Sequence, residues 1–150
     1  MIRAVFDTNL LVSAFLTRHH PGGVSTELLR FVEAGAVELC LSPAIIEEAA
    51  ATLVRSERLQ ARYNYTRDLA VLYCADLFTV VTLIADPPPL PSAVCRDPDD
   101  DMIIACAVAA QAPYLVTRDL DLLDLRTYGS IAMVSPEVFL RDIRADSVKR

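Results

Sequence analysis

Strand-like and helix-like segments alternate along almost the entire chain. Short runs of apolar and β-branched residues each precede a longer segment whose apolar positions have helical spacing. The predicted strands are 2–6, 37–41, 79–84, 114–116 and 131–134. Because this order implies right-handed crossovers, it predicts an α/β fold with a parallel sheet of about five strands and helices on both faces. The length of 150 residues fits a single domain over residues 1–150.

Turn and capping residues set the expected ends of the helices. Ser42 and Pro43 supply an N-cap and a proline at the first helical position. The expected helices are 9–16, 25–34, 43–55, 56–78 in two pieces that meet near Asn64, 102–111, 120–125 and 136–143. The proline-rich run 87–91 is interpreted as a stiff connector, since too little chain follows it for a second α/β domain.

The apolar runs are too short for a membrane protein. The longest wholly apolar run, 102–110, falls well short of the roughly 20 residues that span a bilayer. Asp7 interrupts the N-terminal apolar stretch, which argues against a signal peptide. The four cysteines form no CxxC pair and have no zinc-like spacing with histidine. Reduced, mostly buried thiols and a cytoplasmic location are therefore expected.

Acidic residues recur where predicted strands end and where helices begin. Asp7 directly follows the first strand, and Asp119 lies just beyond the fourth. Glu48 and Asp101 are expected near the starts of helices. Because open α/β folds place their ligands at the carboxyl edge of the sheet, we expect these four side chains to converge there. Taken singly, each acid could instead cap a helix or form a local turn.

Converging carboxylates repel one another unless a cation compensates their charge. Oxygen ligands without His or Cys suit Mg²⁺ or Mn²⁺, and the only histidines, His19 and His20, stand in a Pro/Gly loop that is expected to be solvated. Two such ions roughly 4 Å apart would suit in-line displacement at phosphorus, which favours phosphodiester hydrolysis. The sequence contains no P-loop and no plausible Ser-His-Asp or Cys-His set.

Charge does not decide whether the partner is a nucleic acid. The net charge of −6 disfavours backbone binding, but a metal site built of carboxylates gives the same sign. Arg55, Arg58 and Arg62 are spaced by three and four residues and so share a helix face, with Arg67 nearby. This face is either a solvated surface or a ridge that contacts RNA phosphates.

Four segments, in order along the chain, resemble the successive motifs of the PIN domain family. They are Val5-Phe6-Asp7-Thr8-Asn9, Ser42-Pro43 with Glu48 six residues after the serine, Asp97 to Asp101 leading into Met102-Ile103-Ile104-Ala105-Cys106-Ala107, and Leu115-Val116-Thr117-Arg118-Asp119. The resemblance covers nearly the whole chain. It implies a three-layer α/β/α sandwich and a Mg²⁺- or Mn²⁺-dependent endoribonuclease, similar in size to the stand-alone toxins of prokaryotic toxin-antitoxin pairs.

The resemblance also implies roles for individual residues. Asp7, Glu48, Asp101 and Asp119 match the acidic quartet that binds metal and catalyses cleavage. The residues that would orient these carboxylates by hydrogen bonds are Thr8, Asn9 and Thr117. The neighbouring acids Glu47, Asp97, Asp99, Asp100 and Asp121 remain alternative ligands. The implied partners are an RNA substrate, a cognate antitoxin and a second copy of the chain in a homodimer.

Two other functions compete with a ribonuclease. A metal-dependent phosphohydrolase for small phosphate esters often carries a second Asp two residues after a strand-end nucleophile, and here Asn9 occupies that position. A PIN-like module that binds RNA or protein without turnover would have no need for a complete acidic set, because clustered carboxylates are costly without a cation.

Overall fold

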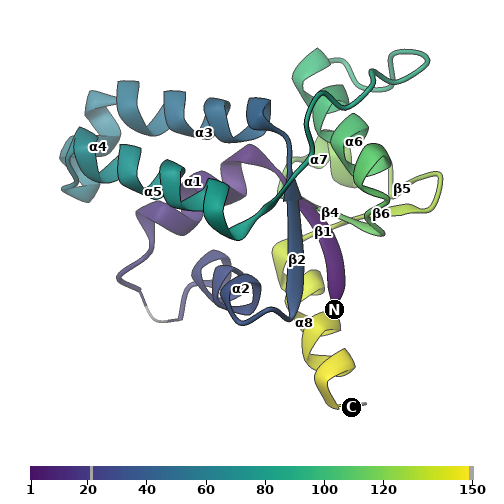
Figure 1. Ribbon diagram of the computed structural model, residues 1–150, viewed down its shortest axis with the longest axis horizontal. Coiled ribbons are helices and arrows are strands. Elements are labelled where there is room, and N and C mark those ends of the chain that lie inside the picture. The colour runs from purple at the N-terminus through teal and green to yellow at the C-terminus, as the bar shows by residue number, and fades with distance from the viewer. Residues whose placement is uncertain (21, 149–150) are drawn as a thin grey trace.

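A six-stranded sheet forms the centre of the computed structural model, which describes residues 1–20 and 22–148 (Figure 1). The strand order is β3-β2-β1-β4-β6-β5. The strands are β1 (Ile2–Phe6), β2 (Val37–Leu41), β3 (Thr82–Leu83), β4 (Tyr114–Val116), β5 (Thr127–Tyr128) and β6 (Ile131–Val134). All paired strands are parallel except β5 and β6. The predicted α/β fold is therefore confirmed, and β5 is a short antiparallel addition that was not predicted.

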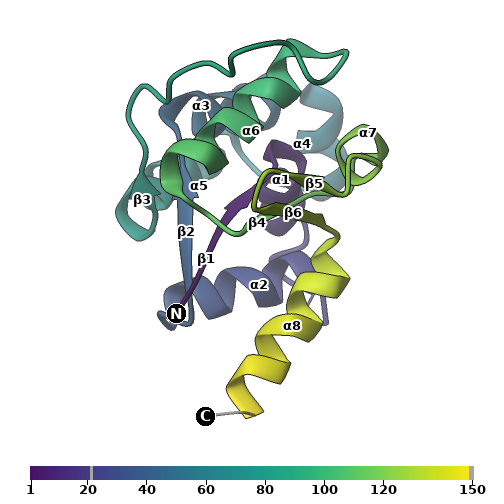
Figure 2. The ribbon, with the colours of Figure 1, turned by 90° about the vertical axis from the view of Figure 1, so that its right-hand side faces the viewer.

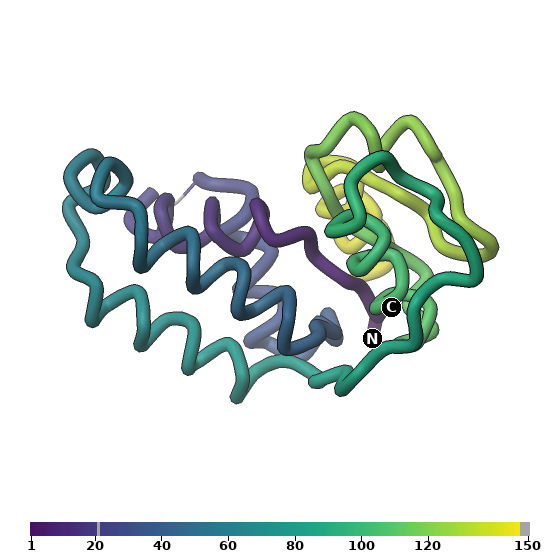
Figure 3. Tube along the Cα trace, turned by 90° about the horizontal axis from the view of Figure 1, so that it is seen from above, coloured from purple at the N-terminus to yellow at the C-terminus, as the bar shows by residue number. Residues whose placement is uncertain are grey.

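Helices cover both faces of the sheet. They are α1 (Thr8–Leu16), α2 (Val24–Glu33), α3 (Pro43–Arg55), α4 (Glu57–Tyr63), α5 (Arg67–Val80), α6 (Pro98–Ala110), α7 (Leu120–Leu123) and α8 (Pro136–Val148). α6 packs against β1, β2 and β4, whereas α2 packs against β2 on the other side and contacts α8 (Figure 2). α3 and α5 run side by side as a two-helix arm, with α4 at its far end (Figure 3).

The register of the central strands brings the segments after β1, β4 and β6 together. Phe6 is opposite Val116, and Val116 is opposite Val134. Backbone hydrogen bonds continue one residue further, from the Asp7 amide to the Val116 carbonyl (2.9 Å) and from the Thr117 amide to the Val134 carbonyl (3.0 Å). Asp7 and Thr117 are consequently fixed as neighbours at the carboxyl edge of the sheet.

α6 begins four residues earlier than the expected start at Met102. Asp97 is its N-cap, and the Asp97 carboxylate accepts a hydrogen bond of 2.9 Å from the Asp99 amide. Pro98 occupies the first helical position, as Pro43 does in α3. Asp100 and Asp101 are therefore successive residues of the first helical turn, and their side chains point about 100° apart around the axis.

α5 and β3 divide residues 67–84 differently from the prediction. Asn64 adopts a left-handed backbone (φ 51°) and ends α4, so the expected break is confirmed there. The next helix, however, continues to Val80, and β3 contains only Thr82 and Leu83. Leu77 and Cys74 are buried where α5 packs along α3, and this packing overrides the strand preference of the β-branched residues that follow.

The remaining structural expectations concern thiols and membrane spans. Cys40, Cys74 and Cys106 are buried, Cys95 is half-buried, and all four are free. Within residues 1–20 and 22–148, the structure contains no helix of the length and apolar character needed to cross a bilayer.

Candidate metal centre

Asp7 is a buried acid at the point where β1 becomes α1. Asp7 is only 5% exposed. It occupies the N-cap position of α1, but its side chain makes no capping hydrogen bond. Burial raises the pKa of Asp7, and the charge of Asp119 adds to this rise. The Thr117 hydroxyl and the nearby amides of Thr8 and Asn9 oppose it. The Asp7 carboxylate is thus held in place by hydrogen bonds, but its negative charge is only partly compensated.

Thr117 connects two of the acids. Its hydroxyl donates a hydrogen bond of 2.7 Å to Asp7 Oδ2 and accepts one of 3.0 Å from the Asp119 amide. The Thr117 residue is fully buried. Asp119 in turn caps α7, because its Oδ1 accepts a hydrogen bond of 2.9 Å from the Asp121 amide. One threonine therefore sets the positions of both strand-end acids.

Thr117→Val is expected to destabilise the protein by about 1–3 kcal/mol, because it leaves the buried Asp7 carboxylate and the Asp119 amide without their shared partner. Valine has nearly the same shape, so the loss reports the hydroxyl and not the packing. Thermal and urea unfolding of Thr117→Val, beside Thr79→Val on the exposed side of α5, measures it. Equal unfolding free energies for the two variants would show that the Thr117 hydroxyl does not contribute to the stability of the fold.

Glu48 faces the same region from α3. The Thr8 hydroxyl, one residue after Asp7, donates a hydrogen bond of 3.2 Å to Glu48 Oε2. Partial burial raises the pKa of Glu48, and the charges of Asp99, Asp7 and Asp97 raise it further. Glu47 lines a separate cleft on another side of α3. The structure thus brings Glu48, and not Glu47, into contact with the segment that carries Asp7.

The structure does not bring Asp101 to the other acids. Its two carboxylate oxygens accept hydrogen bonds from the backbone amides of Val94 (3.0 Å) and Cys95 (2.8 Å). Burial tends to raise the pKa of Asp101, but these amides lower it below its usual range. Asp100 instead lies beside Asp119 and Asp121 and is only 8% exposed. The geometry therefore favours Asp100 over Asp101 as the acid that α6 contributes.

Three carboxylates form the tightest acidic group in the described part of the chain. Asp100, Asp119 and Asp121 each offer one oxygen, and these oxygens lie within 4.8 Å of one another. The pKa of Asp100 is raised to about 6. Burial is the largest cause, and the negative charges of Asp119 and Asp7 raise the pKa further. Asp97, by contrast, is engaged as the cap of α6. The group contains only oxygen donors, which is the ligand set preferred by hard divalent cations.

The raised pKa values of these carboxyl groups predict how the stability of the metal-free protein depends on pH. The pKa of Asp100 is about 6 when folded and about 3.9 when unfolded, so the folded state binds more protons between these values. Asp7 and Glu48 act in the same direction because their pKa values are also raised. The contribution of these groups to stability is therefore fully present at low pH and is lost as the pH rises through about 6.

In EDTA, we expect the free energy of unfolding to be about 1–2 kcal/mol higher at about pH 5 than at about pH 7.5. Asp101, whose pKa is lowered, loses its contribution only at more acidic pH and does not oppose this trend. Urea unfolding at both pH values measures the difference, and Asp100→Asn is expected to reduce it. A free energy of unfolding that rises with pH over this interval would contradict the close placement of these buried carboxyl groups.

The four arginines lie away from the acidic group. Arg55 ends α3, Arg58 and Arg62 lie on α4, and Arg67 begins α5. All four are exposed at the far end of the two-helix arm (Figure 1). Arg55 is seven residues beyond Glu48, which corresponds to about 10 Å along the helix axis.

Two polar residues near the centre differ from expectation. Arg96, for which the sequence predicted no role, extends its guanidinium to within 3.7 Å of Asp121 Oδ1 and is largely exposed. The only sequence signal for it was its position directly before Asp97. Asn9, expected to orient a carboxylate, has an exposed side chain that makes no hydrogen bond within the described structure. Its backbone amide, however, helps to lower the pKa of Asp7.

Comparison with known proteins agrees with this architecture. The sequence profile of the PIN domain matches residues 3–121. The structure resembles that of VapBC2 from Rickettsia felis bound to a DNA fragment from its promoter, with a TM-score of 0.59 and 14% identity over 89% of this chain and 98% of that chain. It also resembles PAE2754 from Pyrobaculum aerophilum, with a TM-score of 0.58 and 15% identity over 96% of this chain and 90% of that chain. The search of curated proteins found no matching relative.

Proposed function

Because the chain belongs to the PIN domain family, we propose that it is a divalent-metal-dependent endoribonuclease whose centre contains Asp7, Glu48, Asp100 and Asp119. One observation carries the proposal: acids from four separate connections of the fold gather at the carboxyl edge of the sheet. Their pKa values are raised where they are most buried, as expected for carboxylates that lack a compensating cation.

The donor set fits Mg²⁺ or Mn²⁺. Asp100, Asp119 and Asp121 supply closely spaced carboxylate oxygens, and no His or Cys belongs to the group. Asp7 lies close enough to raise the pKa of Asp100 through its charge. When bound, such a cation lowers the pKa of coordinated water and stabilises negative charge on phosphate oxygens.

The protein's own residues hold and orient the reacting groups. The Thr117 hydroxyl keeps Asp7 Oδ2 in place, and the Thr8 hydroxyl does the same for Glu48 Oε2. Glu48 Oε1 is not engaged by Thr8. Because the pKa of the Glu48 carboxyl is raised, this group is suited to accept a proton from an attacking water. The exposed guanidinium of Arg96, beside Asp121, is placed to meet a phosphate of the substrate.

RNA is the substrate that we propose, and it would extend from the acidic centre along α3. Arg55, at the end of α3, would be the first arginine that this RNA strand meets. Arg58, Arg62 and Arg67 would contact phosphates further along the RNA, at the end of the two-helix arm. We further propose that the protein is the toxin of a toxin-antitoxin pair with a cognate antitoxin, and that it forms a homodimer in the cytoplasm. The similarity in fold to VapBC2, a toxin-antitoxin complex, supports this role.

Cleavage of an end-labelled single-stranded RNA tests the function. We expect internal cleavage in Mn²⁺ or Mg²⁺, none in EDTA, and recovery when the metal is restored. The same reactions with a generic phosphomonoester are expected to release no inorganic phosphate. Phosphate release without RNA cleavage would indicate a small-ester phosphohydrolase, and RNA binding without any turnover would indicate a non-catalytic module.

A further inference from the structure

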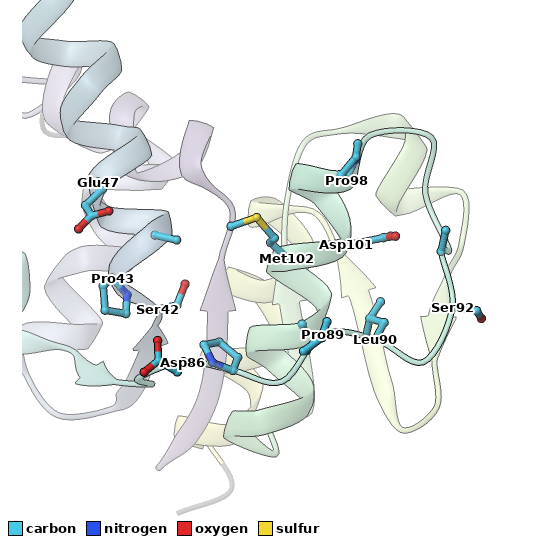
Figure 4. A pocket seen from close by; sticks show the side chains of 14 residues that line it. Ser42, Pro43, Glu47, Asp86, Pro89, Leu90, Ser92, Pro98, Asp101 and Met102 are labelled. Atoms are coloured by element: carbon cyan, nitrogen blue, oxygen red, sulfur yellow. The ribbon is translucent and has the colours of Figure 1, made fainter.

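A cleft separate from the acidic centre opens between α3, α6 and the connector that joins β3 to α6 (Figure 4). Its volume is about 560 Å³. Most of its wall is apolar, with Pro43 from α3, Met102 from α6, and Pro87, Pro89 and Leu90 from the connector. The Met102 side chain is 45% exposed and extends toward α3 in Figure 4. The cleft therefore offers an apolar floor to a ligand from solvent.

The charged residues that line the cleft are all acidic. They are Glu47, Asp86 and Asp101, and no Lys, Arg or His is among the lining residues. Asp101 is already bonded to two backbone amides. Glu47 and Asp86 are exposed, and their carboxylates have no hydrogen-bond or ion-pair partner within the described structure. Two unpaired negative charges thus stand at the edge of an apolar surface.

The backbone conformation at Asp86 restricts the residue types that fit this position. Asp86 has a left-handed conformation with φ 45° although it directly precedes Pro87. Few residue types other than glycine tolerate this region, and Asp and Asn are among them. An Asp86→Asn variant keeps the conformational preference while it removes the charge, which makes it a clean probe.

The cleft does not share its lining with the metal centre. None of Asp7, Glu48, Asp100 and Asp119 lines it. The division follows from helix geometry, because consecutive residues such as Glu47 and Glu48 point about 100° apart. A ligand in the cleft can therefore be recognised by a different chemistry from that of the phosphodiester substrate.

We propose that this cleft binds a linear segment of a partner protein in which apolar side chains alternate with Lys or Arg. The apolar side chains would occupy the wall formed by Met102, Leu90 and the prolines, and the cationic groups would pair with Glu47 and Asp86. Charge complementarity selects this occupant over RNA, since the phosphates of RNA would meet two uncompensated carboxylates.

Fluorescence anisotropy with three labelled peptides tests the proposal on the full chain. One peptide alternates leucine with arginine, a second replaces its leucines with serine, and a third replaces its arginines with glutamate. We expect the first to bind at least about tenfold more tightly than either other peptide. In the double variant Glu47→Gln/Asp86→Asn, its affinity is expected to fall by about fivefold to tenfold.

The matched control removes two acids elsewhere. Glu33→Gln/Asp76→Asn changes the net charge equally at exposed positions on α2 and α5, and less than about a twofold effect is expected. Asp119→Asn, in the acidic centre, is likewise expected to leave peptide affinity within about twofold. Thermal unfolding verifies that each variant is folded.

Several results would overturn the proposal. They are the absence of saturable binding by the leucine-arginine peptide, an equal loss of affinity in the control pair, and a loss confined to Asp119→Asn. If the cleft variant instead altered the affinity for a short single-stranded RNA and not for the peptide, the cleft would be a nucleic-acid site.

Discussion

Asp7→Asn is expected to reduce metal-dependent RNA cleavage by about 100-fold or more while the fold is retained. Asparagine still accepts the hydrogen bond from Thr117, so the junction of β1 and α1 keeps its geometry. What it lacks is the negative charge that a divalent cation needs at this position. Initial cleavage rates of an end-labelled RNA, at a Mn²⁺ concentration that saturates the original protein, measure the loss.

Asp76→Asn is the matched control, because it makes the same chemical change at an exposed acid of α5. It is expected to retain the cleavage rate. In EDTA, the melting temperature of Asp7→Asn is expected to equal or exceed that of the original protein, since burial and Asp119 disfavour the charged form of Asp7. A variant that cleaves RNA at the original rate would remove Asp7 from the mechanism.

Asp100→Asn and Asp101→Asn, at adjacent positions of one helix, are expected to fail in different ways. Asp100→Asn removes a buried carboxylate of the oxygen cluster, so we expect Mn²⁺ affinity and cleavage rate each to fall by about tenfold or more. Asp101→Asn removes only an acceptor for the Val94 and Cys95 amides. Its expected cost is about 1–2 kcal/mol of stability, with Mn²⁺ affinity retained.

Calorimetric titration with Mn²⁺ and urea unfolding, applied to both variants, separate these outcomes. Asp100→Asn is expected to lose metal affinity, whereas Asp101→Asn is expected to lose stability. The opposite pattern, with metal affinity lost only in Asp101→Asn, would identify Asp101 and not Asp100 as the ligand from α6.

The sequence predicted the parts of the fold that local chemistry determines. The Ser42-Pro43 pair marks the start of α3, and the Ser42 hydroxyl accepts a hydrogen bond from the Ile45 amide as an N-cap should. Alternation of strands and helices predicted the parallel sheet, because crossover handedness leaves few other arrangements. β5 escaped prediction since Thr127 and Tyr128 become a strand only by pairing with β6.

The choice among adjacent acids depended on information that spacing alone did not contain. The helix after the proline-rich connector was expected to begin at Met102, so the directions of Asp100 and Asp101 could not be distinguished. Asp97-Pro98 is the true start, and recognising it as a second cap-and-proline pair would have separated them. Glu47 and Glu48 both lie off the apolar face of α3, and the bond from Thr8 that distinguishes them is a tertiary contact.

Anomalous diffraction from a crystal soaked in Mn²⁺ would locate the cation among the acids at the carboxyl edge of the sheet. We expect an anomalous peak within coordination distance, about 2.0–2.3 Å, of Asp100 and Asp119 oxygens, with Asp7 contributing directly or through a water. The same peak is expected to disappear in crystals of Asp7→Asn. A fully soaked crystal with no peak among these acids, or with the ion held by Asp101 instead, would contradict the proposed centre.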